Sequence, residues 1–187
     1  IKFEQQNFLY IKALGSPWVQ FNGQTLNLSH RQIEILCILA LHPHGIGLEE
    51  LHYALYGERS VSLKTLKAEL SQLRSLLPHS IEARIYRLSC EVQCDFLRAE
   101  QSLNANLISS TFSLYKGSFL SKSESPLLST WRHCFDARLS QLIYQIKDID
   151  QLLRIIGQTH DRIDAVQRLL ELLPQDSIHR NYFTNLI

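Results

Sequence analysis

The stretch that decides the fold runs from Leu28 to Leu77 and reads LSHRQIEILCILALHPHGIGLEELHYALYGERSVSLKTLKAELSQLRSLL. Near its start, Ser29 is followed three residues later by Gln32, which is the spacing of a helical capping box. Apolar residues then recur with the period of a helix until Pro43 interrupts the pattern. A second, shorter helix is predicted over residues 48–56.

A third helix is predicted over residues 62–77, with Ser62 as its cap and Pro78 after its end. Its apolar face is a row of leucines at alternating three- and four-residue spacing, namely Leu63, Leu66, Leu70, Leu73 and Leu77. The opposite, outward face holds Lys64, Thr65, Lys67, Ala68, Ser71, Gln72, Arg74 and Ser75.

Side chains of these outward types hydrogen-bond base edges or neutralise phosphates, and the small ones let a helix lie deep in the roughly 12 Å major groove of DNA. A polar outer face is equally typical of any amphipathic surface helix. The helix alone therefore leaves DNA binding and simple solvation both open.

Strands are predicted on both sides of the three helices. Residues 8–11 and 18–21 are rich in aromatic and branched side chains. Asn22-Gly23 predicts a type I′ hairpin turn into a third strand over residues 24–28. Residues 79–88, after the third helix, predict a hairpin of two short strands. Strands, three helices and a final hairpin follow the element order of a winged helix-turn-helix with an N-terminal β-sheet.

Charge is unevenly distributed along a nearly neutral chain. The 187 residues carry a formal net charge of +1, whereas residues 59–87 alone carry +4. A local basic stretch in a neutral protein indicates an anionic partner at that stretch. The basic stretch coincides with the third helix and the hairpin after it.

From Glu91 onward the pattern is almost entirely helical. Helices are predicted over about 91–105, 107–116, 126–156, 160–173 and 176–187, the longest being either one helix or two joined near Asp148. Residues 159–187 have the length and spacing of a single tetratricopeptide-like (TPR-like) repeat. The sequence thus predicts an α+β fold, mostly α, with a winged helix-turn-helix domain over residues 1–90 and a helical domain over residues 91–187.

At this point a family resemblance can be stated. Residues 28–77 resemble the winged helix of response regulators of the OmpR/PhoB type, and more closely that of the antibiotic-regulatory-protein (SARP) family. The shared motifs are EEL…AL-aromatic-G at 49–57, TL…LS.LR..L at 65–77 and YRL at 86–88. The second half is similar to the bacterial transcriptional activation domain (BTAD) of that family, through YKGSFL at 115–120 and DRIDAVQRLLELLPQD at 161–176.

The resemblance implies a cytoplasmic, sequence-specific DNA-binding transcription regulator. In that family the helix at 62–77 enters the major groove, the wing at 79–88 contacts the minor groove, and the loop at 57–62 faces RNA polymerase. Carried over by position, the base-facing residues are Thr65, Ala68, Gln72 and Ser75, the phosphate-binding residues are Lys64, Lys67, Ser71 and Arg74, and the wing contacts are Arg84 and Arg87.

Three departures from the family pattern support an alternative. Family members usually have Arg at the position of Gln72, an apolar residue at that of Glu69 and Gly at that of Ile85. A carboxylate near phosphates is repulsive unless it pairs with a cation or a cytosine amino group. The alternative is therefore a protein-interaction or homodimerisation module whose degenerate winged helix no longer binds DNA.

Other functional classes find little support in the sequence. It contains no Gly-rich phosphate loop, nucleophile elbow or zinc-protease helix, so we expect no enzyme activity, cofactor or metal. The four cysteines are expected to be free thiols, which with the lack of a signal peptide favours the cytoplasm. No apolar run reaches the roughly eighteen residues of a membrane span. The start at Ile1 and the lack of Met predict a piece of a longer protein.

Overall fold

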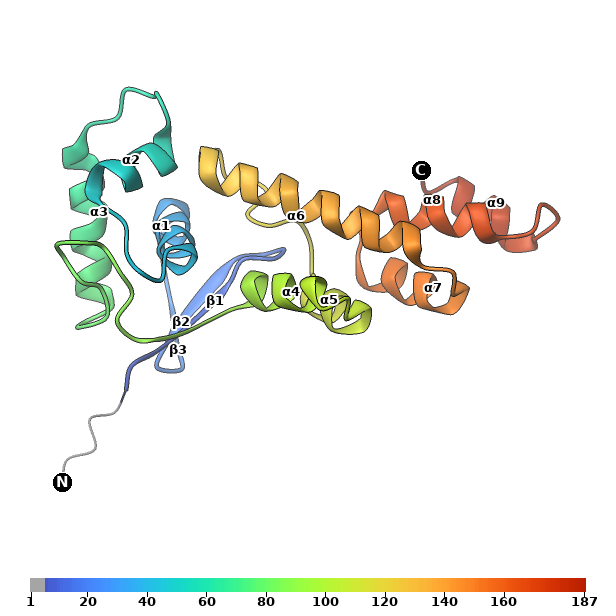
Figure 1. Ribbon diagram of the computed structural model, residues 1–187, viewed down its shortest axis with the longest axis horizontal. Coiled ribbons are helices and arrows are strands. Elements are labelled where there is room, and N and C mark those ends of the chain that lie inside the picture. The colour runs from blue at the N-terminus through green and yellow to red at the C-terminus, as the bar shows by residue number, and fades with distance from the viewer. Residues whose placement is uncertain (1–5) are drawn as a thin grey trace.

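The computed structural model describes residues 6–187 and contains a small sheet surrounded by helices (Figure 1). The strands are β1 (Phe8–Lys12), β2 (Trp18–Phe21), β3 (Gln24–Leu26) and β4 (Glu91–Cys94). The helices are α1 (His30–Leu41), α2 (Leu48–Tyr56), α3 (Leu63–Leu76), α4 (Asp95–Asn104), α5 (Ile108–Leu114), α6 (Pro126–Gln145), α7 (Ile149–Gln158), α8 (Ile163–Leu172) and α9 (Ile178–Thr184). The fold is thus mixed, with most of its regular structure helical.

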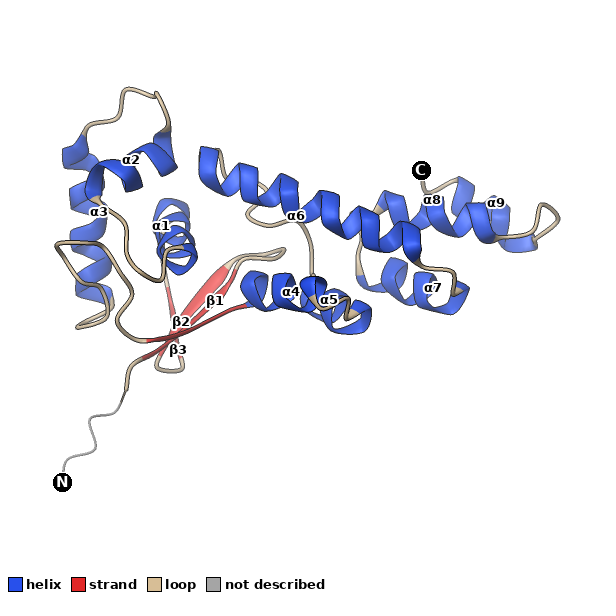
Figure 2. Ribbon diagram, viewed as in Figure 1, coloured by secondary structure: helices blue, strands red, loops and turns tan. Residues whose placement is uncertain are grey.

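The sheet has the strand order β3-β2-β1-β4 (Figure 2). β1, β2 and β3 are antiparallel neighbours, and β4 pairs parallel to β1 with Leu9 opposite Val92. The hairpin between β2 and β3 turns at Asn22 and Gly23, both with positive φ (49° and 81°), which confirms the turn predicted from the sequence. The Asn22 side chain also accepts a 2.8 Å hydrogen bond from the Phe8 backbone N–H.

The prediction of a helix starting at residue 91 is wrong by four residues. Residues 91–94 form β4 and the helix begins at Asp95. The reason is a long-range one, because β4 is held by pairing with β1, more than 80 positions earlier in the chain. Asp95 then fixes the strand-to-helix corner: its buried carboxylate accepts hydrogen bonds from the backbone N–H groups of Ala13, Leu14 and Phe96 at 2.7–2.9 Å.

The three helices of the deciding stretch form where they are predicted. Ser29 and Gln32 make both hydrogen bonds of the capping box at the start of α1. Residues 32–39 of α1 are all buried, which explains the nearly unbroken apolar run in its sequence. Ser62 caps α3 through the Thr65 backbone N–H.

The segment after α3 differs from the two-stranded hairpin predicted at 79–88. It is held by two isolated β-bridges, one between Ile81 and Leu88 and one between Ile46 and Tyr86. Residues 79–88 contain no β-strand. Ile85 lies over the turn between α1 and α2, since a Cβ built on Gly45 would stand 2.2 Å from its Cγ2 atom. The close contact and the positive φ of Gly45 (95°) together require glycine there.

The helical half is organised by the long α6, which runs from beside α2 to α8 (Figure 1). The pattern predicted over 126–156 is two helices, because residues 146–148 leave the helix and Asp148 caps α7 through two backbone N–H groups. Arg162 is buried between α6 and α8, where it pairs with Asp136 and Asp164. α8 and α9 pack against each other as the last helix pair.

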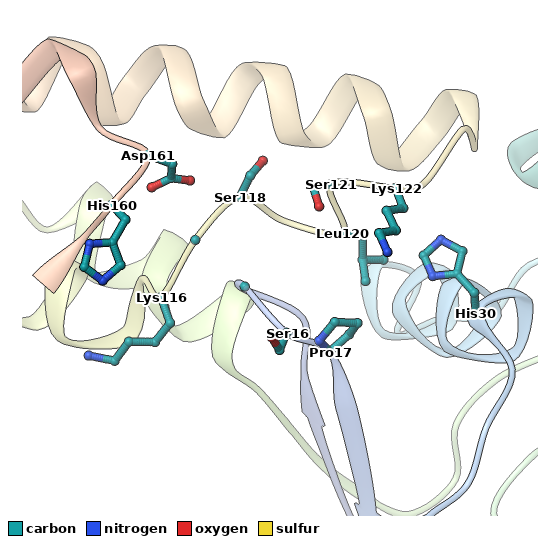
Figure 3. Close-up of a pocket in the computed structure, with 12 residues that line it drawn as sticks. Ser16, Pro17, His30, Lys116, Ser118, Leu120, Ser121, Lys122, His160 and Asp161 are labelled. Carbon is teal, nitrogen blue, oxygen red and sulfur yellow. The ribbon is translucent and has the colours of Figure 1, made fainter. Parts of the chain in front are cut away.

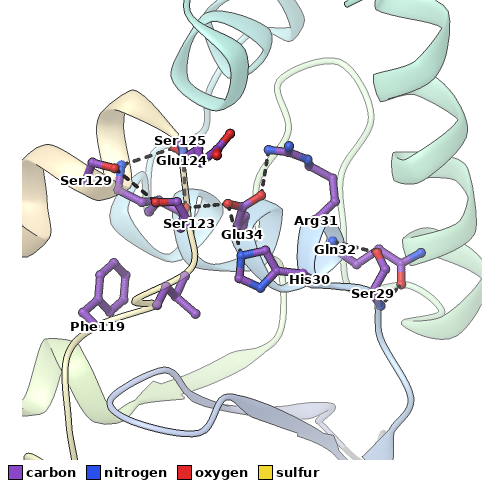
Figure 4. A network of polar contacts seen from close by, with 12 residues as sticks. Ser29, His30, Arg31, Gln32, Glu34, Phe119, Ser123, Glu124, Ser125 and Ser129 are labelled. Carbon is purple, nitrogen blue, oxygen red and sulfur yellow. Dashed lines mark hydrogen bonds and ion pairs between the residues drawn. The ribbon is translucent and has the colours of Figure 1, made fainter.

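The two halves share one hydrophobic core and a polar junction (Figure 4). Glu34 of α1 is 1% exposed; its carboxylate lies 2.7 Å from Arg31 Nη1, accepts a hydrogen bond from Ser123 Oγ and stands 3.5 Å from His30 Nε2. Ser125, the cap of α6, donates to the Ala54 carbonyl of α2 at 2.7 Å. The buried Glu34 carboxylate thus contacts the segment before α6 through one oxygen and Arg31 of its own helix through the other.

Replacing Asp95 tests the corner between β4 and α4. Asp95→Ala removes the acceptor of three backbone N–H groups at a residue that is 3% exposed. We expect the free energy of unfolding to fall by about 3 kcal/mol, measured by urea denaturation. The matched control is Asp148→Ala at an exposed helix cap, for which the expected loss is about 1 kcal/mol. Equal losses in the two variants would contradict the anchoring role of Asp95.

Candidate nucleic-acid interface

The apolar seam of α3 faces the interior. Leu66, Leu70, Leu73 and Leu77 are buried, and α3 packs on α1 and α2. Leu63, at the first position of the helix, is 38% exposed and therefore lies at the margin of the seam. The three-four spacing of the leucines is sufficient to orient the helix, because it places them on one stripe.

The opposite face of α3 is exposed along its whole length. Every outward residue predicted from the sequence lies on this surface: Lys64, Thr65, Lys67, Ala68, Ser71, Gln72, Arg74 and Ser75. The helix stands at the end of the molecule away from α7, α8 and α9 (Figure 1). Nothing in the helical half covers this face.

Three cations on this face are available to an anion. Within residues 6–187, Lys64, Lys67 and Arg74 form no ion pair. They are spaced over nearly three turns of one helix. An exposed row of uncompensated positive charge attracts polyanions over a distance set by the salt concentration.

Two of the polar side chains on this face already form hydrogen bonds within the protein. Gln72 Oε1 accepts a 3.0 Å hydrogen bond from Gln32 Nε2, which orients the amide. Its own NH₂ group remains a donor toward solvent. Ser75 Oγ donates to the Ser71 carbonyl at 3.1 Å.

Glu69 lies on the flank of α3 rather than among the lysines. Its side chain is half-buried, with Oε2 buried. Burial raises the pKa of Tyr56, and the Glu69 carboxylate raises it further while the Arg31 guanidinium lowers it. Arg31 stands 4.6 Å from the centre of the Tyr56 ring. Within residues 6–187 the Glu69 carboxylate forms no ion pair, so it does not neutralise the outward cationic row by direct pairing.

The segment at 79–88 carries two further arginines, of which one forms an ion pair and the other does not. Arg84 is exposed and, within the described part of the chain, unpaired, whereas Arg87 Nη2 lies 2.7 Å from Glu82 Oε1. This ion pair is exposed on both sides, so it contributes little stability and can exchange for another anion at small cost. Ile85 is exposed at the tip between them.

The loop between α2 and α3 is attached to the helical half. Arg59 contacts Glu124, with Nη1 2.8 Å from the carboxylate and Nη2 2.5 Å from the backbone carbonyl. His52 Nε2 lies 2.6 Å from the Val61 carbonyl and supports the loop from α2. Arg59 belongs to the basic stretch, but its charge is paired with Glu124 of the same chain. Glu58 and Ser60 of the loop are exposed.

Sequence reasoning missed the residues that position this face from behind. Gln32 holds Gln72, and Glu34 connects α1 to the helical half. A signal for Glu34 was present, since a lone carboxylate inside an apolar helical run is expected to be paired when buried. Its partner Ser123 lies 89 positions away and carries no such signal.

A metal site, a membrane-spanning helix or a reactive cysteine would each indicate a different function. Among residues 6–187, no three His, Cys, Asp or Glu side chains come together as a metal site, and no helix is long and apolar enough to cross a membrane. Burial raises the pKa of Cys94 to about 12 and also raises that of Cys37, so both thiols stay protonated at neutral pH. Cys134 is exposed on α6.

Comparison with known proteins supports the fold. No family model matches the chain. A curated protein of Rhodococcus erythropolis, described as an uncharacterized 47.3 kDa protein in the thcA 5′ region, is 28% identical over 153 residues, which cover 81% of this chain and 35% of that protein. The structure of Mycobacterium tuberculosis EmbR in complex with a low-affinity phosphopeptide superposes with a TM-score of 0.56 at 16% identity, covering 97% of this chain and 56% of that one. The chain therefore has an EmbR-like fold and spans only part of the length of both proteins.

The orientation of α3 is tested by two leucines of the same helix. Leu70 is 2% exposed and Leu76 is 41% exposed. We expect Leu70→Ala to lower the free energy of unfolding by about 3 kcal/mol because it leaves a cavity, and Leu76→Ala to lower it by less than about 1 kcal/mol. Urea denaturation followed by circular dichroism measures both. The reverse order would show that the helix is rotated and that the lysine face is buried.

Proposed function

We propose that the chain is the output portion of a SARP-type transcriptional regulator that binds double-stranded DNA in a sequence-specific manner. The observation that carries the proposal is the exposed face of α3, with Lys64, Lys67 and Arg74 unpaired within residues 6–187. The fold shared with EmbR, a regulator of the SARP type, supports it, as does the SARP-like pattern of the sequence. This assignment makes the protein a regulator rather than an enzyme.

In the proposed complex, α1, α2, α3 and the segment at 79–88 act as a winged helix-turn-helix. α3 enters the major groove, where Ala68, Ser71 and Ser75 keep the helix surface low enough for close approach. The segment at 79–88 acts as the wing and reaches the adjacent minor groove. Residues 1–90 then form the DNA-binding part and residues 91–187 the BTAD-like, TPR-like part.

Roles follow from side-chain chemistry and from position along α3. The lysines, Arg74 and Ser71 hold phosphates, which fixes the register of the protein on the duplex. Gln72 is the main base reader, because an amide held by Gln32 presents its NH₂ group in a defined direction. The full proposed set of DNA-binding residues is Lys64, Thr65, Lys67, Ala68, Ser71, Gln72, Arg74, Ser75, Arg84 and Arg87.

The loop at 57–62 is proposed as the contact with RNA polymerase. Its Arg59 side chain contacts Glu124, just before α6, while Glu58 and Ser60 are exposed. The helical half is proposed to mediate homodimerisation. A dimer would require paired half-sites spaced by about one turn of the double helix.

A second candidate is a protein-interaction module without DNA binding. It is favoured by the Arg87–Glu82 pair and the Gln72–Gln32 hydrogen bond, which engage two of the predicted DNA contacts within the protein. Under this alternative no duplex is bound at low salt, and partner binding or dimerisation survives replacement of Lys64 and Lys67. Mobility-shift assays and sedimentation of the Lys64→Ala/Lys67→Ala variant distinguish the two candidates.

Salt dependence tests the DNA-binding proposal directly. The affinity for a cognate duplex is expected to fall by about 0.9 log units per log unit of salt for each phosphate neutralised. Lys64→Ala should weaken binding to all sequences. It should also lower the number of neutralised phosphates that the salt slope reports by about one. Gln72→Ala should keep the slope and change the preference at one base pair by about 1–3 kcal/mol.

Fluorescence anisotropy at several salt concentrations measures both quantities. Lys147→Ala is the matched control, since Lys147 is exposed in the segment between α6 and α7, and Figure 1 shows these two helices far from α3. A flat salt response of the unmodified protein, or an equal effect of the Lys64 and Lys147 variants, would contradict the proposed interface.

A further inference from the structure

A cavity of about 840 Å³ lies where the two halves of the chain meet (Figure 3). Its walls come from the turn between β1 and β2, the segment at 116–122, residues 160–161 and His30 at the start of α1. The volume falls in the range of small-molecule sites, which is about 300–1,000 Å³. None of its lining residues belongs to the proposed DNA interface.

The walls of the cavity are held together by backbone contacts. Leu14 and Phe119 form a β-bridge, and the Leu120 N–H donates to the Ala13 carbonyl at 3.1 Å. Gly15 has φ 82°, and a Cβ at this residue would stand 2.6 Å from the Lys116 carbonyl oxygen. The approach of these two segments is thus possible only with glycine, and the cavity is preformed.

One lysine and one histidine stand at each end of the cavity. Figure 3 shows Lys122 and His30 at one end and Lys116 and His160 at the other. Across residues 6–187, neither lysine forms an ion pair. The one carboxylate among the lining residues of the described chain, Asp161, accepts a 2.8 Å hydrogen bond from the Tyr115 hydroxyl.

The two ends differ in their surroundings. The Lys122 end lies at the N-terminus of α1, a twelve-residue helix whose dipole favours an anion there. Glu34 stands near His30, and its charge is balanced by Arg31 at 2.7 Å. The hydroxyls of Ser118 and Ser121 line the same cavity and hydrogen-bond to no other group within residues 6–187, so they are free to donate to a ligand.

We propose that this cavity binds an organic phosphate, with the phosphate group at the Lys122 end. Lys122, His30 and the Ser121 hydroxyl supply the charge-assisted donors that a phosphate requires. Pro17 and Leu120 line the middle of the cavity and provide an apolar wall for the organic portion. The cavity is much larger than an inorganic phosphate ion, so the organic portion determines selectivity. The proposal does not depend on DNA binding.

Isothermal titration calorimetry of the 187-residue chain tests the proposal, with adenosine 5′-monophosphate and ribose 5-phosphate as probes. Adenosine and inorganic phosphate are the matched controls for the two portions of the ligand. At least one phosphorylated probe is expected to bind with a Kd below about 1 mM and at least about tenfold more tightly than either control. Absence of binding by both phosphorylated probes, or equal binding of the controls, would overturn the proposal.

Substitution of the lysine at each end of the cavity tests which end binds the phosphate group. Lys122→Gln is expected to weaken binding by about tenfold or more, because it removes a charged hydrogen-bond donor. Lys116→Gln, at the other end of the cavity, should weaken it less than about threefold, and Lys147→Gln, outside the cavity, should leave it unchanged. Circular dichroism confirms that each variant is folded. A large effect of Lys116→Gln with none of Lys122→Gln would overturn the assigned orientation.

Discussion

The inward packing of four leucines on α3 is the constraint on which the rest of the structure depends. With Leu66, Leu70, Leu73 and Leu77 buried against α1 and α2, the polar side of the helix has only one direction left, toward solvent. Burial of each leucine contributes on the order of 2 kcal/mol, far more than an exposed charge costs or gains. The apolar side therefore determines the orientation, and the cationic row is its consequence.

The junction behind α1 extends this constraint to the helical half. Glu34 and Ser123 join α1 to the segment before α6, and Gln32, two residues earlier on α1, holds Gln72 on α3. One helix thus contacts both the proposed DNA-reading residue and the second half of the chain. The proposed phosphate cavity lies beside the same junction, at His30. A ligand there would contact the two halves at once.

Local signals predicted much of the architecture, whereas long-range contacts were beyond them. The capping box at Ser29, the Asn22-Gly23 turn and the leucine spacing of α3 act within a few residues, so each was readable from the sequence. β4 was missed because its pairing partner, β1, lies more than 80 residues earlier in the chain. The Gln32–Gln72 bond and the cavity at 116–122 were missed for the same reason. The roles of individual side chains toward DNA stay predictions.

Selection of bound duplexes from a random DNA pool tests the central claim most directly. The account predicts enrichment of a defined motif by the unmodified protein, and its loss by a folded Lys64→Ala/Gln72→Ala/Arg74→Ala variant. Enrichment of the same motif by both proteins would show that another surface contacts DNA. No enrichment by the unmodified protein would contradict sequence-specific binding through the outward face of α3.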